Sequence, residues 1–413
     1  MSKKTTIIII LVVAVLVLAL GIFLLFFTSP TATPGTQNNY SPFGNYNGKI
    51  ASTTPTTTPT DTVGDDQQYI NDPTSPLIKI STAPIAGAQT FTRKVTGTTT
   101  TNIVRYMERA TGHTREYDRT TNMLSTASNT TVPSIYQAWW SGNTVLAQFI
   151  GQSKDNIRTF TATLPASTTP STQLVGGFLT ENIKALAVSP KGNRVFTIPA
   201  GENAVGSISN LDGSKKTSIL NFPFNEWTAQ WPSENTITLT TKPSFSAPGF
   251  MYLLSTAGSM TKAMGNIPGL TTNTSPDLNY AIYSNSTSGG FLTGVYDLVK
   301  NTGITFTNNA TLPEKCVWSK TSKTTAYCAI PASVPIANYP DDWYQGNLSF
   351  VDNIYKVDLK LPAVQLIYNL PKQENIDAIN LFLDAKDENL YFTNKNDYFL
   401  WGLTIKGLSP IGQ

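Results

Sequence analysis

Residues 186–198 read Leu-Ala-Val-Ser-Pro-Lys-Gly-Asn-Arg-Val-Phe-Thr-Ile, and residues 229–239 read Ala-Gln-Trp-Pro-Ser-Glu-Asn-Thr-Ile-Thr-Leu. In each stretch a short apolar segment leads into a turn that is rich in Ser, Pro, Gly or Asn, and a second segment rich in β-branched residues follows it. Apolar segments on both sides of such a turn are typical of a β-hairpin. Because this pattern returns along the chain, it decides the fold.

The hairpin pattern recurs from about residue 85 to the C-terminus, with turns about 40–60 residues apart, which is the spacing of four-stranded propeller blades. The sequence contains seven such units, with six or eight as the alternative counts. Sheets arranged radially bury their faces against one another. The predicted fold class is therefore an all-β, seven-bladed β-propeller of four-stranded antiparallel blades, with a β-sandwich pair or a solenoid as the alternative.

The last unit has no room for a fourth strand after Ile405. Residues 76–81, which read Pro-Leu-Ile-Lys-Ile-Ser, are similar to the fourth strands of the other units. We therefore expect this segment to close the ring by pairing with the last blade.

The turns at residues 189–193 (Ser-Pro-Lys-Gly-Asn) and 275–279 (Ser-Pro-Asp-Leu-Asn) resemble the Ser-Pro-Asp-Gly turn of TolB-like, WD40-like propeller repeats in bacterial envelope proteins. Three further turns match this pattern in part, at Trp140-Ser, Trp231-Pro and Trp318-Ser. The three tryptophans share one position of the repeat, which indicates a role in the core. The resemblance covers roughly residues 76–410 and implies the fold and an envelope setting. It implies no particular partner, because this chain has no room for the additional domain of TolB.

The N-terminus predicts a membrane anchor. Residues 7–27 are an unbroken apolar run, about long enough for a helix to cross a bilayer, and Lys3 and Lys4 precede it. The predicted organisation is a cytoplasmic stub (1–6), a transmembrane helix (7–27), a Thr/Pro-rich disordered linker (28–75) and the propeller (76–413). This organisation places the protein in the cytoplasmic membrane as a single-pass chain, with its C-terminal domain outside the cytoplasm. A cleavable signal peptide is the alternative to the anchor.

Composition excludes some classes of function. The formal net charge is only +3 and no Lys/Arg stripe occurs, so nucleic-acid binding is not expected. The two cysteines, Cys316 and Cys328, flank a hairpin turn centred near Ser322. Residues opposed in this way lie within disulfide range, so we expect a disulfide, with two free thiols as the alternative. Two cysteines and the single His113 are too few for a metal site, and no cofactor is expected.

The repeat is interrupted at residues 331–351, between the second and third strands of the sixth unit. In a propeller such loops share one face, here called the loop face, with the loops that join consecutive blades. Loops on rigid scaffolds often carry function. The candidate binding residues are Tyr339, Asp341, Asp342, Trp343 and Tyr344, whose aromatic rings suit a sugar or peptide and whose carboxylates suit a cation or basic group. The alternative is a loop that packs its aromatic side chains over the blade.

The sequence favours a binding or scaffold module for an envelope protein, peptide or glycan, engaged through the loop face. The alternative is a glycan-active hydrolase or lyase, which requires carboxylates that converge at the channel mouth beneath Trp343. Asp341, Asp342, Glu226 and Glu314 are the candidates for that role. No catalytic residue is assigned, because His113 has no nucleophile motif near it and the acidic cluster at residues 384–388 is expected to be a solvated turn.

Overall fold

The turn at residues 275–279 shows how the repeated sequence makes a hairpin. The Ser275 Oγ donates a hydrogen bond to Asp277 Oδ1 at 2.7 Å and accepts one from the backbone N–H of Tyr280 at 3.0 Å. Leu278 has a positive φ of 61°, which turns the chain back on itself. Local hydrogen bonds therefore fix the turn between strands β18 (Thr272–Thr274) and β19 (Tyr280–Thr287).

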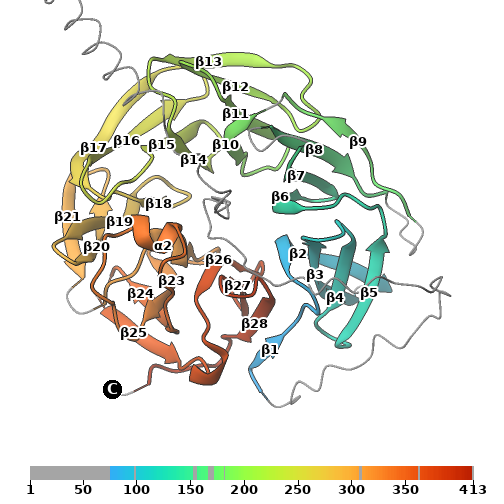
Figure 1. Cartoon of the computed structure of the whole chain (residues 1–413). Helices are drawn as coiled ribbons and strands as arrows, with labels where there is room; N and C mark the ends of the chain where they lie inside the picture. Colours follow the sequence, from blue (N-terminus) through green and yellow to red (C-terminus); the bar gives the residue numbers. More distant parts are fainter. Residues whose placement is uncertain are drawn as a thin grey trace, which may run out of the picture. The chain divides into compact units, whose positions relative to one another are not determined.

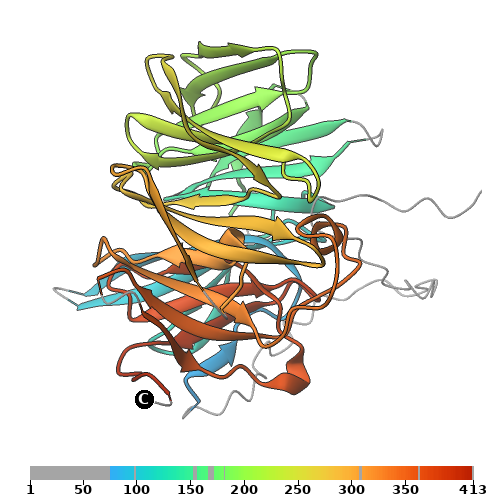
Figure 2. The same cartoon turned by 90° about the vertical axis from the view of Figure 1, so that its left-hand side faces the viewer.

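Seven four-stranded antiparallel sheets form the blades of a ring, shown face-on in Figure 1 and from its edge in Figure 2. This computed structural model describes residues 75–96, 99–151, 156–165, 172–180, 182–306, 309–360 and 363–411. The predicted all-β, seven-bladed propeller is confirmed. The predicted transmembrane helix and all of the linker but Ser75 lie outside the described residues. Within the described ranges, no helix combines the length and apolar character needed to cross a membrane.

Each blade contributes one innermost strand to the channel wall (Figure 1). In chain order from blade 1 to blade 7 these are β2 (Ile85–Thr96), β6 (Ile135–Ser141), β10 (Ile183–Val188), β14 (Trp227–Ser233), β18, β22 (Cys316–Trp318) and β26 (Ala378–Leu383). The second strands are β3 (Thr99–Glu108), β7 (Thr144–Ile150), β11 (Arg194–Pro199), β15 (Thr236–Thr241), β19, β23 (Thr325–Pro331) and β27 (Asn389–Asn394).

The outer half of each blade is built in the same way. The third strands are β4 (Thr114–Asp118), β8 (Ile157–Thr163), β12 (Ala204–Asn210), β16 (Pro248–Ser255), β20 (Gly290–Asp297), β24 (Asp352–Asp358) and β28 (Leu400–Thr404). The outermost strands are β5 (Met123–Ser128), β9 (Val175–Phe178), β13 (Thr217–Phe222), β17 (Met260–Pro268), β21 (Thr302–Phe306), β25 (Ala363–Tyr368) and, in blade 7, β1 (Leu77–Lys79).

Strand β1 closes the ring as the sequence predicted. It pairs antiparallel with β28, with Ile78 opposite Gly402. The backbone N–H of Ile80 also donates to Leu400 O at 2.8 Å, and that of Thr404 donates to Pro76 O at 2.9 Å. The outermost strand of blade 7 therefore comes from the N-terminal end of the domain, so the first and last parts of the propeller are held in one sheet.

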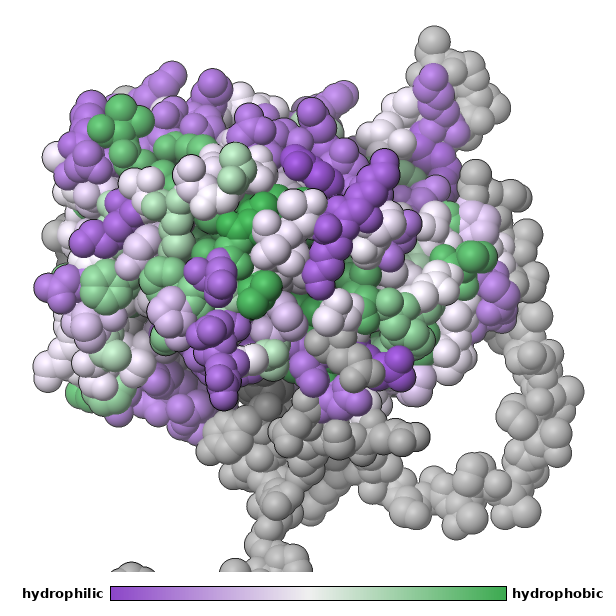
Figure 3. Space-filling model, turned by 90° about the horizontal axis from the view of Figure 1, so that it is seen from above, coloured by the Kyte–Doolittle hydropathy of each residue, from purple (hydrophilic) through white to green (hydrophobic). Residues whose placement is uncertain are grey.

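Apolar side chains between neighbouring blades form the core. Between blades 7 and 1, for example, Ile78 and Ile80 pack in one cluster with Ile85, Val104 and Tyr391. The outer wall is mixed: Figure 3 shows apolar groups interrupted by polar ones, and exposed apolar side chains such as Val175 and Val205 lie on strands of blades 2 and 3. The buried area that stabilises the ring therefore lies mainly at the seams between blades.

Candidate functional site

The insertion at residues 332–351, between β23 and β24, folds back onto the loop face and includes the short helix α2 (Asp341–Tyr344). Three of its rings are buried: Tyr339, Trp343 and Phe350 are at most 1% exposed. The Phe350 ring stacks on that of Tyr339, with centroids 5.8 Å apart, and on that of Trp343, at 6.1 Å. The insertion thus has an aromatic core of its own.

The polar candidates of this loop form hydrogen bonds to the ring or within the loop itself. Asp341 Oδ2 accepts a hydrogen bond at 2.6 Å from the backbone N–H of Phe245, in the loop between β15 and β16 of blade 4. Asp342 accepts hydrogen bonds from residues 338 and 347 of its own loop. The Tyr344 hydroxyl donates to Glu314 Oε1. The structure thus brings the five predicted residues together in a packed loop, and their role in binding stays a prediction.

A buried cluster of charges lies beneath this loop. Lys315 Nζ donates to Asp352 Oδ2 at 2.7 Å, to Ala378 O at 3.0 Å, and to Asp377 Oδ1. The side chains of Lys315, Asp352 and Asp377 are all fully buried. Sequence analysis did not identify this cluster. Its members come from the short 3-10 helix η1 (Pro313–Lys315), the first residue of β24 and the residue before β26, so it joins blade 6 to blade 7.

Burial and mutual attraction shift the pKa values of this cluster in different directions. Burial would lower the pKa of Lys315, but the two carboxylates outweigh it and raise that pKa. Burial raises the pKa of Asp352 to about 7, against the opposing effect of Lys315. Burial also opposes ionisation of Asp377, yet Lys315 and hydrogen bonds from Phe350 and Trp343 hold the pKa of Asp377 below its usual value. One carboxylate is therefore ionised while the other titrates near neutrality.

Glu314, a carboxylate candidate from the sequence, lies beside this cluster and is half-buried. Burial raises its pKa, and hydrogen bonds from Tyr344 and Thr271 oppose that shift. Glu226, the other candidate outside the insertion, forms ion pairs with Lys184 at 2.7 Å and Lys242 at 3.1 Å. The structure does not bring these two glutamates together.

A cavity of about 790 Å³ opens from the channel between blades 5, 6 and 7. Its lining residues come from the innermost strands and from the turns between first and second strands, at the end of the ring opposite the loop face; we call this end the turn face. They are Asn273, Pro276, Asp277, Cys316, Val317, Trp318, Ser319, Lys320, Thr321, Ser322, Lys323 and Leu381. The volume is in the range of natural small-ligand sites.

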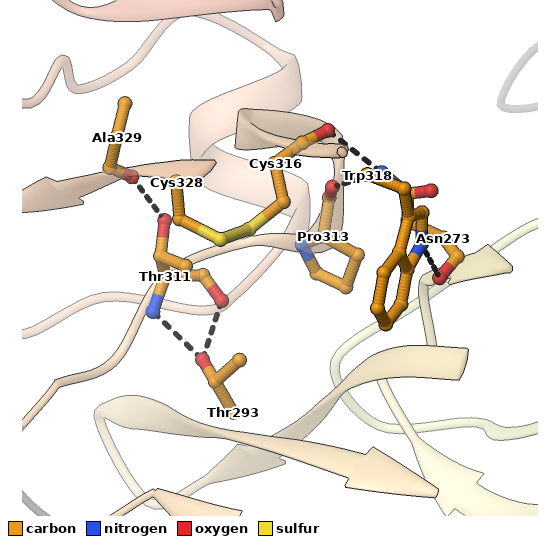
Figure 4. The surroundings of a disulfide bond; sticks show 8 residues. All are labelled: Asn273, Thr293, Thr311, Pro313, Cys316, Trp318, Cys328 and Ala329. Carbon is orange, nitrogen blue, oxygen red and sulfur yellow. Dashed lines mark hydrogen bonds between the residues drawn. A yellow bond between two sulfur atoms is a disulfide. The ribbon is translucent and has the colours of Figure 1, made fainter. Parts of the chain in front are cut away.

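One wall of this cavity is fixed by a disulfide and a half-buried amide (Figure 4). Cys316 and Cys328 are directly opposed in β22 and β23, with an S–S distance of 2.07 Å, so the predicted disulfide is present in the structure. The Asn273 side chain donates to Cys316 O at 2.7 Å, and Trp318 Nε1 donates to Asn273 O at 3.1 Å. The Trp318 indole is therefore held against the cavity between blades 5 and 6.

The turn at residues 319–323 forms the rim of the cavity, and Asp387 of blade 7 anchors it. Asp387 Oδ2 accepts hydrogen bonds from the hydroxyls of Ser319 at 2.5 Å and Thr321 at 2.7 Å. The expectation of a solvated acidic turn at residues 384–388 is wrong for Asp384, which is only 1% exposed and accepts a hydrogen bond from the backbone N–H of Glu388 at 2.8 Å. The acidic turn of blade 7 thus positions the turn of the preceding blade 6.

The rim carries two lysines. Lys320 and Lys323 are exposed, although the Lys320 ammonium also donates to Leu383 O at 2.6 Å. The oxygens of Asp277 already accept hydrogen bonds from Ser275 and Asn279 within their own turn. The cavity therefore offers the ammonium group of Lys323, an apolar wall and a largely buried indole, since Trp318 is 6% exposed.

A second cavity of about 280 Å³ lies on the other side of Leu381, which lines both. Its described lining includes Trp139 and Trp140 but no carboxylate, and Asp277 is the one carboxylate lining the first cavity. These two cavities therefore do not hold the converging carboxylates that the hydrolase or lyase alternative places at the channel mouth. Beneath Trp343, Asp352 and Asp377 do come together, but they are fully buried and paired with Lys315. His113 lies away from both cavities, beside Glu108 and Thr131, and no cluster of His, Cys, Asp or Glu within the described ranges is arranged to hold a metal ion.

Comparison with known proteins finds solved structures of low similarity. No family model and no curated protein matches the sequence. Solved structures to which the chain is similar include a streptogramin B lyase, with 12% identity, a TM-score of 0.47, and coverage of 80% of this chain and 97% of that chain. The β-propeller domain of the Trilobed protease from Pyrococcus furiosus has 11% identity and a TM-score of 0.45, covering 77% of this chain and 93% of that chain. TolB from Acinetobacter baumannii has 10% identity and a TM-score of 0.40, covering 77% of this chain and 79% of that chain. The seven four-stranded sheets agree with the fold that the resemblance to TolB-like propellers implies.

Proposed function

We propose that this propeller is a binding module which takes an acidic segment of an envelope protein, peptide or glycan into the cavity at the turn face. The observation that carries the proposal is the cavity of about 790 Å³ lined by Trp318, Lys320 and Lys323. Aromatic rings supply large contact area at low loss of conformational entropy, and lysines attract carboxylates. The ring supports such a site because the disulfide and Asp387 hold its wall and rim in place.

Pull-down of the full chain with envelope extract tests this proposal. Lys323→Glu reverses an exposed charge at the rim, and the matched control Lys262→Glu makes the same change on the outermost strand of blade 4. The wild type and the control are expected to recover the same acidic partner, and Lys323→Glu is expected to recover at least tenfold less. Equal recovery by all three proteins would contradict the proposal.

The loop face is the second candidate surface, and one observation favours it. Ile336, near the start of the insertion, is 93% exposed, the highest value among the large apolar residues of the described chain. An exposed apolar side chain on an anchored loop suits a protein contact. If Ile336→Asp abolishes recovery of the partner while Lys323→Glu retains it, the binding surface is the loop face around Asp341 and Tyr344.

The setting proposed for this module is the outside of the cytoplasmic membrane. The apolar run 7–27 would anchor the chain with its N-terminus in the cytoplasm, and the segment 28–75 would tether the ring. Protease added to intact spheroplasts is expected to release the folded propeller by cutting within residues 28–75. Release only after the membrane has been permeabilised would contradict this orientation.

A further inference from the structure

The cluster under the insertion brings an amine and two carboxyl groups into contact in a fully buried site. Lys315 Nζ lies 2.7 Å from Asp352 Oδ2 and also contacts Asp377 Oδ1, and none of the three side chains is exposed. Taking three charged groups out of water is costly, and their attraction offsets this only in part. A reaction that turns the charged groups into neutral ones would remove that penalty.

Asp352 has the features of the group that is attacked. Its Oδ2 accepts a hydrogen bond at 2.6 Å from the backbone N–H of Ala378, which polarises the carboxyl group. Its Oδ1 is buried and has no hydrogen-bond partner within the described chain, so this oxygen is free to leave. Burial also raises the pKa of Asp352, and a neutral carboxylic acid is a better electrophile than a carboxylate.

Asp377 is placed to act as the base. Its Oδ2 accepts hydrogen bonds from Trp343 Nε1 at 2.9 Å, Ser349 Oγ at 3.1 Å and the backbone N–H of Phe350 at 3.0 Å. These donors hold the carboxylate ionised and fix its orientation. Its other oxygen, Oδ1, contacts the ammonium of Lys315 and is placed to take its proton.

Aromatic rings enclose the amine. The ring centroids of Trp343 and Phe350 lie 5.4 Å and 5.3 Å from Lys315 Nζ. Both rings are at most 1% exposed, so the insertion shields the cluster from water. Groups held in contact inside a protein react as if at very high concentration.

We propose that Lys315 and Asp352 join in an intramolecular isopeptide bond, with Asp377 as the catalytic base. The ammonium of Lys315 first gives a proton to the carboxylate of Asp377, which is an uphill step because the pKa of the amine is raised and that of the carboxyl group is lowered in this cluster. The neutral amine then attacks the carboxyl carbon of protonated Asp352. The C–N bond forms, the bond from that carbon to Oδ1 breaks, and the departing hydroxyl group takes the second amine proton and leaves as water. Asp377 remains a neutral acid, and no oxidant or other reactant is required.

The mass of the full wild-type chain, purified in detergent and measured after reduction and alkylation, tests the proposal directly. We expect a mass that is lower, by one molecule of water, than the mass calculated for the sequence with both cysteines alkylated. Tryptic digestion should then yield a branched peptide that joins residues 301–320, uncleaved after Lys315, to residues 324–356. Reduction comes first because the disulfide between Cys316 and Cys328 would link the same two peptides.

Two variants define the roles. Lys315→Arg keeps the positive charge but cannot form the amide, and Asp377→Asn removes the base; both should retain the full sequence mass. A wild-type mass that shows no loss of water would overturn the proposal, whether or not the variants fold. A branch to residues 373–386 would overturn it as well, because that peptide contains Asp377 instead of Asp352.

Discussion

Replacement of Ile78 and Ile80 by alanine is expected to destabilise the ring at its closure. Both side chains are buried, at 5% and 3% exposure, in the apolar cluster between blades 7 and 1. Truncation of a buried Ile to Ala lowers the free energy of unfolding by about 2–5 kcal/mol, so the sum for both residues lies at roughly 4–10 kcal/mol. Because the two side chains share one cluster, their losses are not additive, and we expect the lower part of this range, about 4–6 kcal/mol.

Urea unfolding of the purified chain, followed by tryptophan fluorescence, measures this loss. With a slope near 3 kcal/mol per molar, the double variant should unfold at a urea concentration lower by roughly 1–2 M. Val175→Ala is the matched control, since Val175 is 70% exposed on the outermost strand of blade 2 and should change stability by less than about 0.5 kcal/mol. If the double variant unfolds at the wild-type midpoint, β1 does not hold the ring and the reasoning is refuted.

Three further predictions concern the site. Peptide mapping under non-reducing conditions should find Cys316 linked to Cys328, and replacing both by serine should lower stability by about 3 kcal/mol, the chain-entropy value for a loop of this length; two free thiols in the native protein would contradict the structure. Burial would raise the pKa of Asp387, but hydrogen bonds from the hydroxyls and amides of residues 319–321 outweigh it and hold that pKa below its usual value. The contribution of Asp387 to stability is therefore present above the unfolded pKa and is lost as the pH falls through the folded pKa. Asp387→Asn should make stability fall less steeply with decreasing pH, and an unchanged acid side of the stability–pH profile would refute this. Trp343→Ala should lower stability by about 3–5 kcal/mol and expose the insertion to limited proteolysis. Tyr344→Phe should lower stability by about 1–3 kcal/mol without exposing the insertion. Equal protease resistance of the wild type and both variants would show that the insertion does not depend on its buried ring.

The sequence was sufficient to predict the ring because the blades repeat local chemistry. The turn at residues 275–279 closes through its own Ser275 and Asp277, so its hairpin depends on adjacent residues alone. Residues 76–81 were identifiable as the closing strand because six complete units left one blade a strand short. The disulfide followed from the same register, which places Cys316 opposite Cys328.

The cluster beneath the insertion was not predictable in the same way. Lys315 and Asp377 are 62 residues apart, and charged residues are usually exposed, so no local pattern marks them as buried partners. The predicted loop residues show the same limit. The Pro and Gly residues at the ends of the segment fit an exposed Trp343 as well as a packed one. Asp377 of blade 7 decides between the two, because it accepts a hydrogen bond from the indole N–H of Trp343.

The most direct test of the binding proposal is photocrosslinking from single positions of the full chain in cells. A photoreactive amino acid would replace Lys323 at the rim of the turn-face cavity, Ile336 on the insertion, or Lys262 on the outer wall as the control. We predict that position 323 captures a partner rich in acidic groups and that positions 336 and 262 do not. Capture from position 336 with none from position 323 would contradict the proposed site.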